Sequence, residues 1–74
     1  MKQRIVINPK ILSGKPIING TRISVEFVLE LLSSGMTVDE ILKEYSHLHK
    51  DDILAVLDYA TKTIRHEEVY PLLP

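Results

Sequence analysis

Apolar residues follow two different periods along this chain. Up to residue 24 they form short β-branched runs bounded by Gly, Pro and Asn, and from residue 25 they recur every three or four positions. The first pattern is typical of strands and turns, and the second of amphipathic helices. We therefore predict a β arm and hairpin over residues 1–24 and a helical core over residues 25–68. Because Pro71 and Pro74 oppose a helix, residues 69–74 are predicted to be a tail of the same domain.

The arm carries a strong hairpin signal. Residues 16–18 and 21–23 flank Asn19-Gly20, the pair most typical of a type I′ turn, in which both central residues have positive φ. An isolated hairpin is only marginally stable in water, so another strand or a helix must support it. Residues 4–7 are the candidate third strand, supplied either by the same chain or by a second copy.

Three start signals predict three helices, over residues 25–34, over residues 38–45, and from about residue 50 into the mid-sixties. Each helix follows a residue that can cap it, and each cap lies between two apolar residues in the hydrophobic-staple pattern. The caps are Ser24, Thr37, which forms a capping box with Glu40, and His49. Gly35 is predicted to end the first helix in a left-handed conformation.

The apolar faces predict how the helices pack. The first helix has too many apolar residues for one stripe, which suits a central helix or one that is partly an interface. The second carries a regular stripe of Val38, Ile41, Leu42 and Tyr45. The third carries Ile53, Val56, Leu57, Ala60 and Ile64 on one face, with Leu54 and Tyr59 outside it. We expect these last two residues to pack on the hairpin or on a second subunit.

Composition restricts the class of protein. A chain of 74 residues without cysteine forms one domain that has neither disulfides nor thiolate metal sites. No stretch approaches the roughly 20 apolar residues of a transmembrane helix, and the first residues lack a signal-peptide pattern. We therefore expect a cytoplasmic protein without a membrane partner. Small domains often gain stability by oligomerising, and a homodimer is expected.

The net charge of −1 conceals an asymmetry between the arm and the helical core. Residues 1–25 contain five basic residues and no acid, whereas residues 26–74 contain four basic residues against ten acids. A basic arm indicates an anionic partner, pairing of the arm with the acidic body of another subunit, or simply a solvated arm. The candidate contacts for a partner or for nucleic acid are Arg4, Lys10, Lys15, Arg22 and Lys50. For Arg22 itself we favour a salt bridge to an acid of the second or third helix.

Convergent reactive groups are scarce. His47 and His49 are two positions apart and do not face each other on a helix, so turn and capping roles are preferred to a metal site. No Ser-His-Asp arrangement and no phosphate-binding glycine loop can be placed. We therefore predict no catalytic residue, no metal, no cofactor and no enzymatic activity.

The second and third helices have the spacing of a helix-turn-helix, with Leu48 placed to fill the corner between them. The third helix, which would be the recognition helix, begins with Asp51 and Asp52, and two carboxylates near phosphates oppose DNA binding. The overall prediction is a mostly α fold, in which a short β-strand and hairpin precede a three-helix, helix-turn-helix bundle.

An ordered set of short motifs resembles the family known as domain of unknown function 433. The motifs are Gly-x-Pro at residues 14–16, Gly-Thr-Arg-Ile at 20–23, Gly-Met at 35–36, His-Leu at 47–48, and an Asp-Ile to Tyr-Ala helix over 52–60. The resemblance implies a homeodomain-like fold and a VapB-like antitoxin of a toxin–antitoxin system, whose partner is a PIN-like ribonuclease toxin. It also implies possible DNA binding at the protein's own promoter. The alternative is a stand-alone helix-turn-helix DNA-binding regulator.

Overall fold

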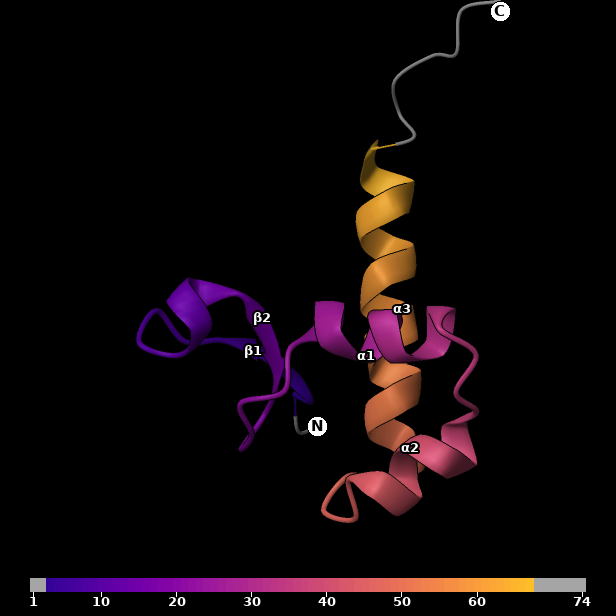
Figure 1. Cartoon of the computed structure of the whole chain (residues 1–74). Helices are drawn as coiled ribbons and strands as arrows, with labels where there is room; N and C mark the ends of the chain where they lie inside the picture. Colours follow the sequence, from indigo (N-terminus) through magenta and orange to yellow (C-terminus); the bar gives the residue numbers. More distant parts are fainter. Residues whose placement is uncertain (1–2, 68–74) are drawn as a thin grey trace, which may run out of the picture.

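The structure is a computed structural model that describes residues 3–67. Within these residues, two short strands and one 3₁₀ turn precede three helices, which confirms the predicted mostly α class with an N-terminal β arm (Figure 1). The elements are β1 (Ile5–Ile7), η1 (Leu12–Gly14), β2 (Pro16–Ile18), α1 (Val25–Ser33), α2 (Val38–Glu44) and α3 (Lys50–Glu67). Residue 68 and the predicted tail 69–74 lie outside the described residues.

The two strands form an antiparallel pair within one chain. Val6 lies opposite Ile17, and the loop that joins the strands contains η1. The candidate strand at residues 4–7 is therefore supplied by the same chain. The predicted return strand over residues 21–23 forms only in part, because Ile17 makes an isolated bridge to Ser24 and the chain then enters α1.

The prediction of a type I′ turn at Asn19-Gly20 is wrong. Gly20 has a φ of +81°, but Asn19 is not among the residues with positive φ. The Thr21 backbone N–H donates to the Ile18 carbonyl at 3.0 Å, which together with the positive φ at Gly20 describes a type II turn. The Thr21 hydroxyl donates to the same carbonyl at 2.8 Å and accepts from the Ile23 N–H at 2.9 Å. These side-chain bonds direct the chain toward the cap of α1 instead of along a strand.

The predicted helix starts are confirmed. The Ser24 hydroxyl accepts from the Phe27 N–H at 2.9 Å, and the capping box joins Thr37 to Glu40 at 3.1 and 2.8 Å. His49 holds the position before α3, but the cap contact comes from another side chain. The backbone N–H of His49 donates to Asp52 Oδ2 at 2.8 Å, and this contact is the acidic half of a capping box.

Two backbone hydrogen bonds, made by Gly35 and by the residue after it, end α1. The Gly35 N–H donates to the Leu32 carbonyl at 3.1 Å, and the Met36 N–H donates to the Leu31 carbonyl at 3.2 Å, which is a Schellman motif. The φ of Gly35 is +102°, as the sequence predicts for a left-handed cap.

Replacing Gly35 with alanine is expected to cost about 1–2 kcal/mol of stability, because an L side chain is strained at this φ. No other atom lies within 4 Å of the added Cβ, so the cost comes from the backbone alone. Urea unfolding followed by circular dichroism measures it, with Ser33→Ala as the control at an exposed helical position. Equal stability of the two variants would contradict the role of Gly35 as a left-handed cap of α1.

One cluster of buried side chains joins the arm to all three helices. It consists of Ile18, Val25, Val28, Ile41, Leu48, Ile53 and Val56. Figure 1 shows α1 lying across α3, with α2 near the N-terminal half of α3. Leu48 fills the corner between α2 and α3 as predicted. Leu57 and Ile64, predicted as core residues of α3, are exposed instead.

The C-terminal half of α3 explains the exposure of Ile64. It extends past α1, so its apolar face meets fewer neighbours than the helical period alone suggests (Figure 1). Tyr59, predicted to lie outside the stripe, is half-buried against the core, whereas Leu54 is exposed. No helix within residues 3–67 combines the length and apolar character that crossing a membrane requires.

Candidate binding groove

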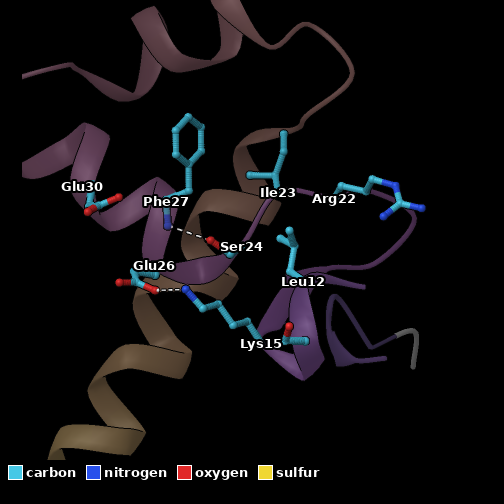
Figure 2. A pocket seen from close by; sticks show the side chains of 9 residues that line it. Leu12, Lys15, Arg22, Ile23, Ser24, Glu26, Phe27 and Glu30 are labelled. Carbon is cyan, nitrogen blue, oxygen red and sulfur yellow. Dashed lines mark hydrogen bonds and ion pairs between the residues drawn. The ribbon is translucent and has the colours of Figure 1, made fainter. Parts of the chain in front are cut away.

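A groove of about 730 Å³ lies between the η1 loop of the arm and the first two turns of α1 (Figure 2). Its lining comes from three segments that the fold brings together: the η1 loop, the residues before α1, and one face of α1 itself. The lining residues are Leu12, Ser13, Lys15, Arg22, Ile23, Ser24, Glu26, Phe27 and Glu30. The arm thus forms one wall of a concave surface, and α1 forms the other.

The η1 loop holds an unusual backbone conformation at the rim. Leu12, Ser13 and Gly14 have φ values of +49°, +56° and +81° in succession. Left-handed geometry costs a residue with a side chain roughly 1–2 kcal/mol. Two hydrogen bonds support it, from the Gly14 N–H to the Ile11 carbonyl at 3.0 Å and from the Lys15 N–H to the Leu12 carbonyl at 3.2 Å. Backbone strain of this kind is concentrated at binding sites, where it orients side chains.

The apolar surface of the groove centres on an aromatic ring. Phe27 is 36% exposed, although it lies on a helix whose neighbouring positions Val25 and Val28 are buried. The Phe27 ring packs edge-to-face on the Tyr45 ring at a centroid distance of 5.8 Å, and this contact holds the Phe27 ring in place. Leu12 adds an exposed aliphatic side chain on the arm side. A rigid aromatic ring in a concave surface is typical of protein-binding anchors.

The charges around the groove are only partly paired. Lys15 Nζ lies 3.0 Å from Glu26 Oε1, which joins the two walls (Figure 2). Both groups are solvated, so this pair contributes little to stability. Among residues 3–67, the exposed guanidinium of Arg22 makes no ion pair and no hydrogen bond. The predicted salt bridge from Arg22 to a helical acid is therefore wrong, because the type II turn carries Arg22 away from α2 and α3.

Arg4 makes the contact to α3 that the sequence assigned to Arg22. Its Nη1 donates to Asp52 Oδ1 at 2.9 Å, and its Nη2 lies 3.5 Å from Asp51 Oδ2. Burial alone raises the pKa of Asp52, but the hydrogen bond from the His49 backbone and the Arg4 guanidinium outweigh it, so this pKa lies below its ordinary value. The arm is thus attached to the start of α3 by a buried carboxylate.

The five predicted contact residues do not form one surface. Arg4 and Lys15 are paired with acids of the same chain, and Arg22 shares the groove with Lys15. Lys10 is exposed on the η1 side, and Lys50 is exposed at the first turn of α3. Sequence reasoning did not identify Phe27 or Leu12 as site residues. The excess of apolar residues on α1 was a signal for Phe27, but nothing in the sequence marked Leu12.

Reactive and metal-binding groups are not brought together in the part of the chain that the structure describes. Residues 3–67 contain no group of three His, Cys, Asp or Glu side chains placed to hold a metal ion. His47 and His49 are both exposed near the α2–α3 turn, and the His49 ring lies 3.7 Å from Asp52 through its Nδ1 atom. The groove offers binding chemistry, consisting of apolar surface with a cation at its edge.

Comparisons with known proteins find one family and one solved structure of the same kind. The family model described as "Protein of unknown function (DUF433)" matches residues 5–60. The fold is similar to the crystal structure of a DUF433 member protein from Anabaena variabilis ATCC 29413, with 27% identity and a TM-score of 0.79. The match covers 85% of this chain and 62% of that chain, so this chain spans less than two thirds of that protein's length. No curated protein matches.

Proposed function

This chain belongs to the DUF433 family of proteins of unknown function, and we propose that it is a protein-binding module without enzymatic activity: the antitoxin of a toxin–antitoxin pair. It covers and silences a PIN-like ribonuclease in the cytoplasm, and it acts as a homodimer. The observation that carries the proposal is the groove between η1 and α1, which combines a fixed aromatic ring with a cation that has no partner among the described residues.

The chemistry of the groove suits the surface of a nuclease. Interface energy is concentrated in a few buried aromatic and arginine anchors, and Phe27 and Arg22 supply one of each at a single concave site. A metal-dependent nuclease presents carboxylates around its active site, and the planar guanidinium of Arg22 can bind a carboxylate through two parallel hydrogen bonds. An antitoxin needs no reactive group of its own, since it acts by covering those of its partner.

Replacing Arg22 with alanine is expected to weaken nuclease binding by about 2 kcal/mol, roughly thirtyfold in Kd, because it removes the unpaired charge at the groove. Lys10→Ala is the matched control, since Lys10 is an exposed cation of the same arm that does not line the groove. The tagged protein is purified from its native host at moderate salt, and any co-purifying small nuclease is produced separately. Binding of each variant to that nuclease is then titrated.

The same titration is repeated with RNA cleavage as the readout. The proposal requires that the wild-type chain inhibits the nuclease and that Arg22→Ala requires a higher concentration for the same inhibition. Unchanged inhibition by Arg22→Ala would exclude this groove as the contact. A native complex without any nuclease would contradict the antitoxin function itself.

A stand-alone DNA-binding regulator is the second candidate, because α2 and α3 enclose the buried corner residue Leu48 as a helix-turn-helix does. The charges favour it less. Arg4 is occupied by the acids at the start of α3, and Asp51 remains exposed where a recognition helix would approach phosphates. Phosphate binding weakens steeply as salt rises, so a titration with the upstream DNA at increasing salt tests this function. Absence of binding at low salt would eliminate it.

A further inference from the structure

One side of α3 carries an apolar stripe that the rest of residues 3–67 leaves exposed. Leu54, Leu57 and Ile64 are 51%, 40% and 55% exposed, and Thr61 is also exposed. The steps between these four residues are three, four and three, which places them on one side of a helix. The stripe borders the buried face of α3, where Ile53 and Val56 fill the core, and Ile64 lies near the line of Ile53 along the helix.

This stripe has the spacing of a coiled-coil seam. Leu54 and Thr61 occupy the a positions of a heptad, and Leu57 and Ile64 occupy the d positions. A recognition helix that reads DNA presents polar and basic side chains to the base edges and phosphates. The stripe itself presents two leucines, an isoleucine and a threonine, so it is suited to another apolar helix.

We propose that the occupant of this stripe is the α3 helix of a second copy, which packs antiparallel across a two-fold axis. A two-fold contact uses the same patch on both subunits, so a self-complementary stripe is required. In the antiparallel register Leu54 meets Ile64 of the second copy, and Leu57 meets Thr61 of the second copy. By symmetry, each of these layers forms twice, which gives four layers along the seam.

Charge complementarity supports this register. It brings Asp51 of one copy beside Arg65 of the other at both ends of the seam, since both are e positions that flank it. Asp51 and Arg65 are both exposed, and Asp51 also lies 3.5 Å from Arg4 of its own chain. The two copies of Asp58 approach each other near the axis, but each is already paired with Lys62, whose Nζ lies 2.9 Å from Asp58 Oδ2. A parallel arrangement would instead place each e position beside a g position of the other copy, so Asp51 and Arg65 would not meet.

This interface is the one that the homodimer of the proposed function would use, but it does not depend on the nuclease. An experiment can therefore contradict the α3 interface without contradicting the antitoxin function, and the reverse. The interface does not use the groove of either copy, because no residue of the stripe lines the groove. It also makes this side of α3 unavailable to DNA. Dimerisation and binding of the upstream DNA through α3 are thus mutually exclusive.

Replacing Leu54 with glutamine is expected to raise the dimer dissociation constant about tenfold or more, since it puts a polar group into an apolar layer. Sedimentation equilibrium over a range of protein concentrations measures the change. Leu12→Gln is the matched control, because Leu12 is an exposed leucine of the groove and not of the stripe. Circular dichroism confirms that both variants remain folded. A wild-type chain that stays monomeric at every concentration, or equal effects of the two substitutions, would overturn the proposal.

Cysteine cross-linking tests the relative direction of the two α3 helices. The sequence contains no native cysteine that could form competing cross-links. Leu54→Cys and Ile64→Cys are prepared as two separate proteins. The antiparallel register predicts that a mixture cross-links rapidly as a heterodimer, while each protein alone cross-links slowly. Rapid cross-linking of Leu54→Cys with itself would indicate a parallel pair, and no cross-linking in any combination would exclude the α3 stripe as the interface.

Discussion

Replacing Asp52 with alanine is expected to destabilise the fold by about 3 kcal/mol, a large fraction of the stability of a domain of this size. Asp52 is the buried charged residue of the described chain, and both of its carboxylate oxygens are occupied. Oδ1 accepts from Arg4 at 2.9 Å, and Oδ2 accepts from the His49 N–H at 2.8 Å. The substitution therefore leaves a guanidinium and a helix N-terminus without their acceptor, and it releases the arm from α3.

The matched control is Asp51→Ala. Asp51 is the adjacent carboxylate of the same helical turn, but it is exposed and lies 3.5 Å from Arg4. We expect a change within about 0.5 kcal/mol, as for other solvated pairs. Urea unfolding of both variants, with Arg4→Ala and the Arg4→Ala/Asp52→Ala double variant, gives the coupling between arm and helix. Similar stabilities for Asp51→Ala and Asp52→Ala would contradict the role assigned to the buried carboxylate.

The same contacts make the free energy of unfolding depend on pH in the acidic range. Because the pKa of Asp52 is lower in the folded chain than its ordinary value of 3.8, the folded state favours the ionised form. Its contribution to stability is therefore complete above roughly pH 5 and is lost as the pH falls through the lowered pKa. Unfolding free energies measured from pH 6 down to pH 2 should fall more steeply for the wild-type chain than for Asp52→Asn, which cannot titrate.

Local chemistry accounts for what the sequence predicted well. Ser24, Thr37 and Gly35 act on backbone groups within four residues of themselves, so their patterns determine the helix ends almost independently of the rest of the fold. Membership of the DUF433 family was likewise indicated by short motifs in order along the chain. The turn at Asn19-Gly20 was placed correctly, but its type depended on Thr21 and on the entry into α1.

Contacts between distant segments account for what the sequence did not predict. Arg4 and Asp52 are 48 positions apart, and no periodicity distinguishes Arg4 from Arg22 as the partner of an acid. The groove required both the left-handed conformation of Leu12 and the orientation of Phe27, which neither segment determines alone. The length by which α3 extends past α1 decided that Ile64 is exposed, and this depends on where the helices cross.

Replacing Ile53 with alanine is expected to cost about 3 kcal/mol, because Ile53 is 0% exposed and the core around it cannot fully close the cavity. It is the counterpart of Leu54, the next residue of α3, which is 51% exposed. In dilute solution Leu54→Ala should change the unfolding free energy by less than about 0.5 kcal/mol, as for other surface substitutions. Urea unfolding of the two variants at the same low protein concentration compares them directly.

Protein concentration separates the two roles further. A dimer gains stability as concentration rises, because association stabilises only the folded chain. Ile53→Ala keeps its stripe, so its deficit relative to the wild-type chain should remain the same at every concentration. Leu54→Ala loses the proposed α3 contact, so its deficit should be small in dilute solution and grow as the wild-type chain dimerises. A deficit for Leu54→Ala that is independent of concentration would mean that the side chain supports only its own monomer, and that the stripe on α3 has another use.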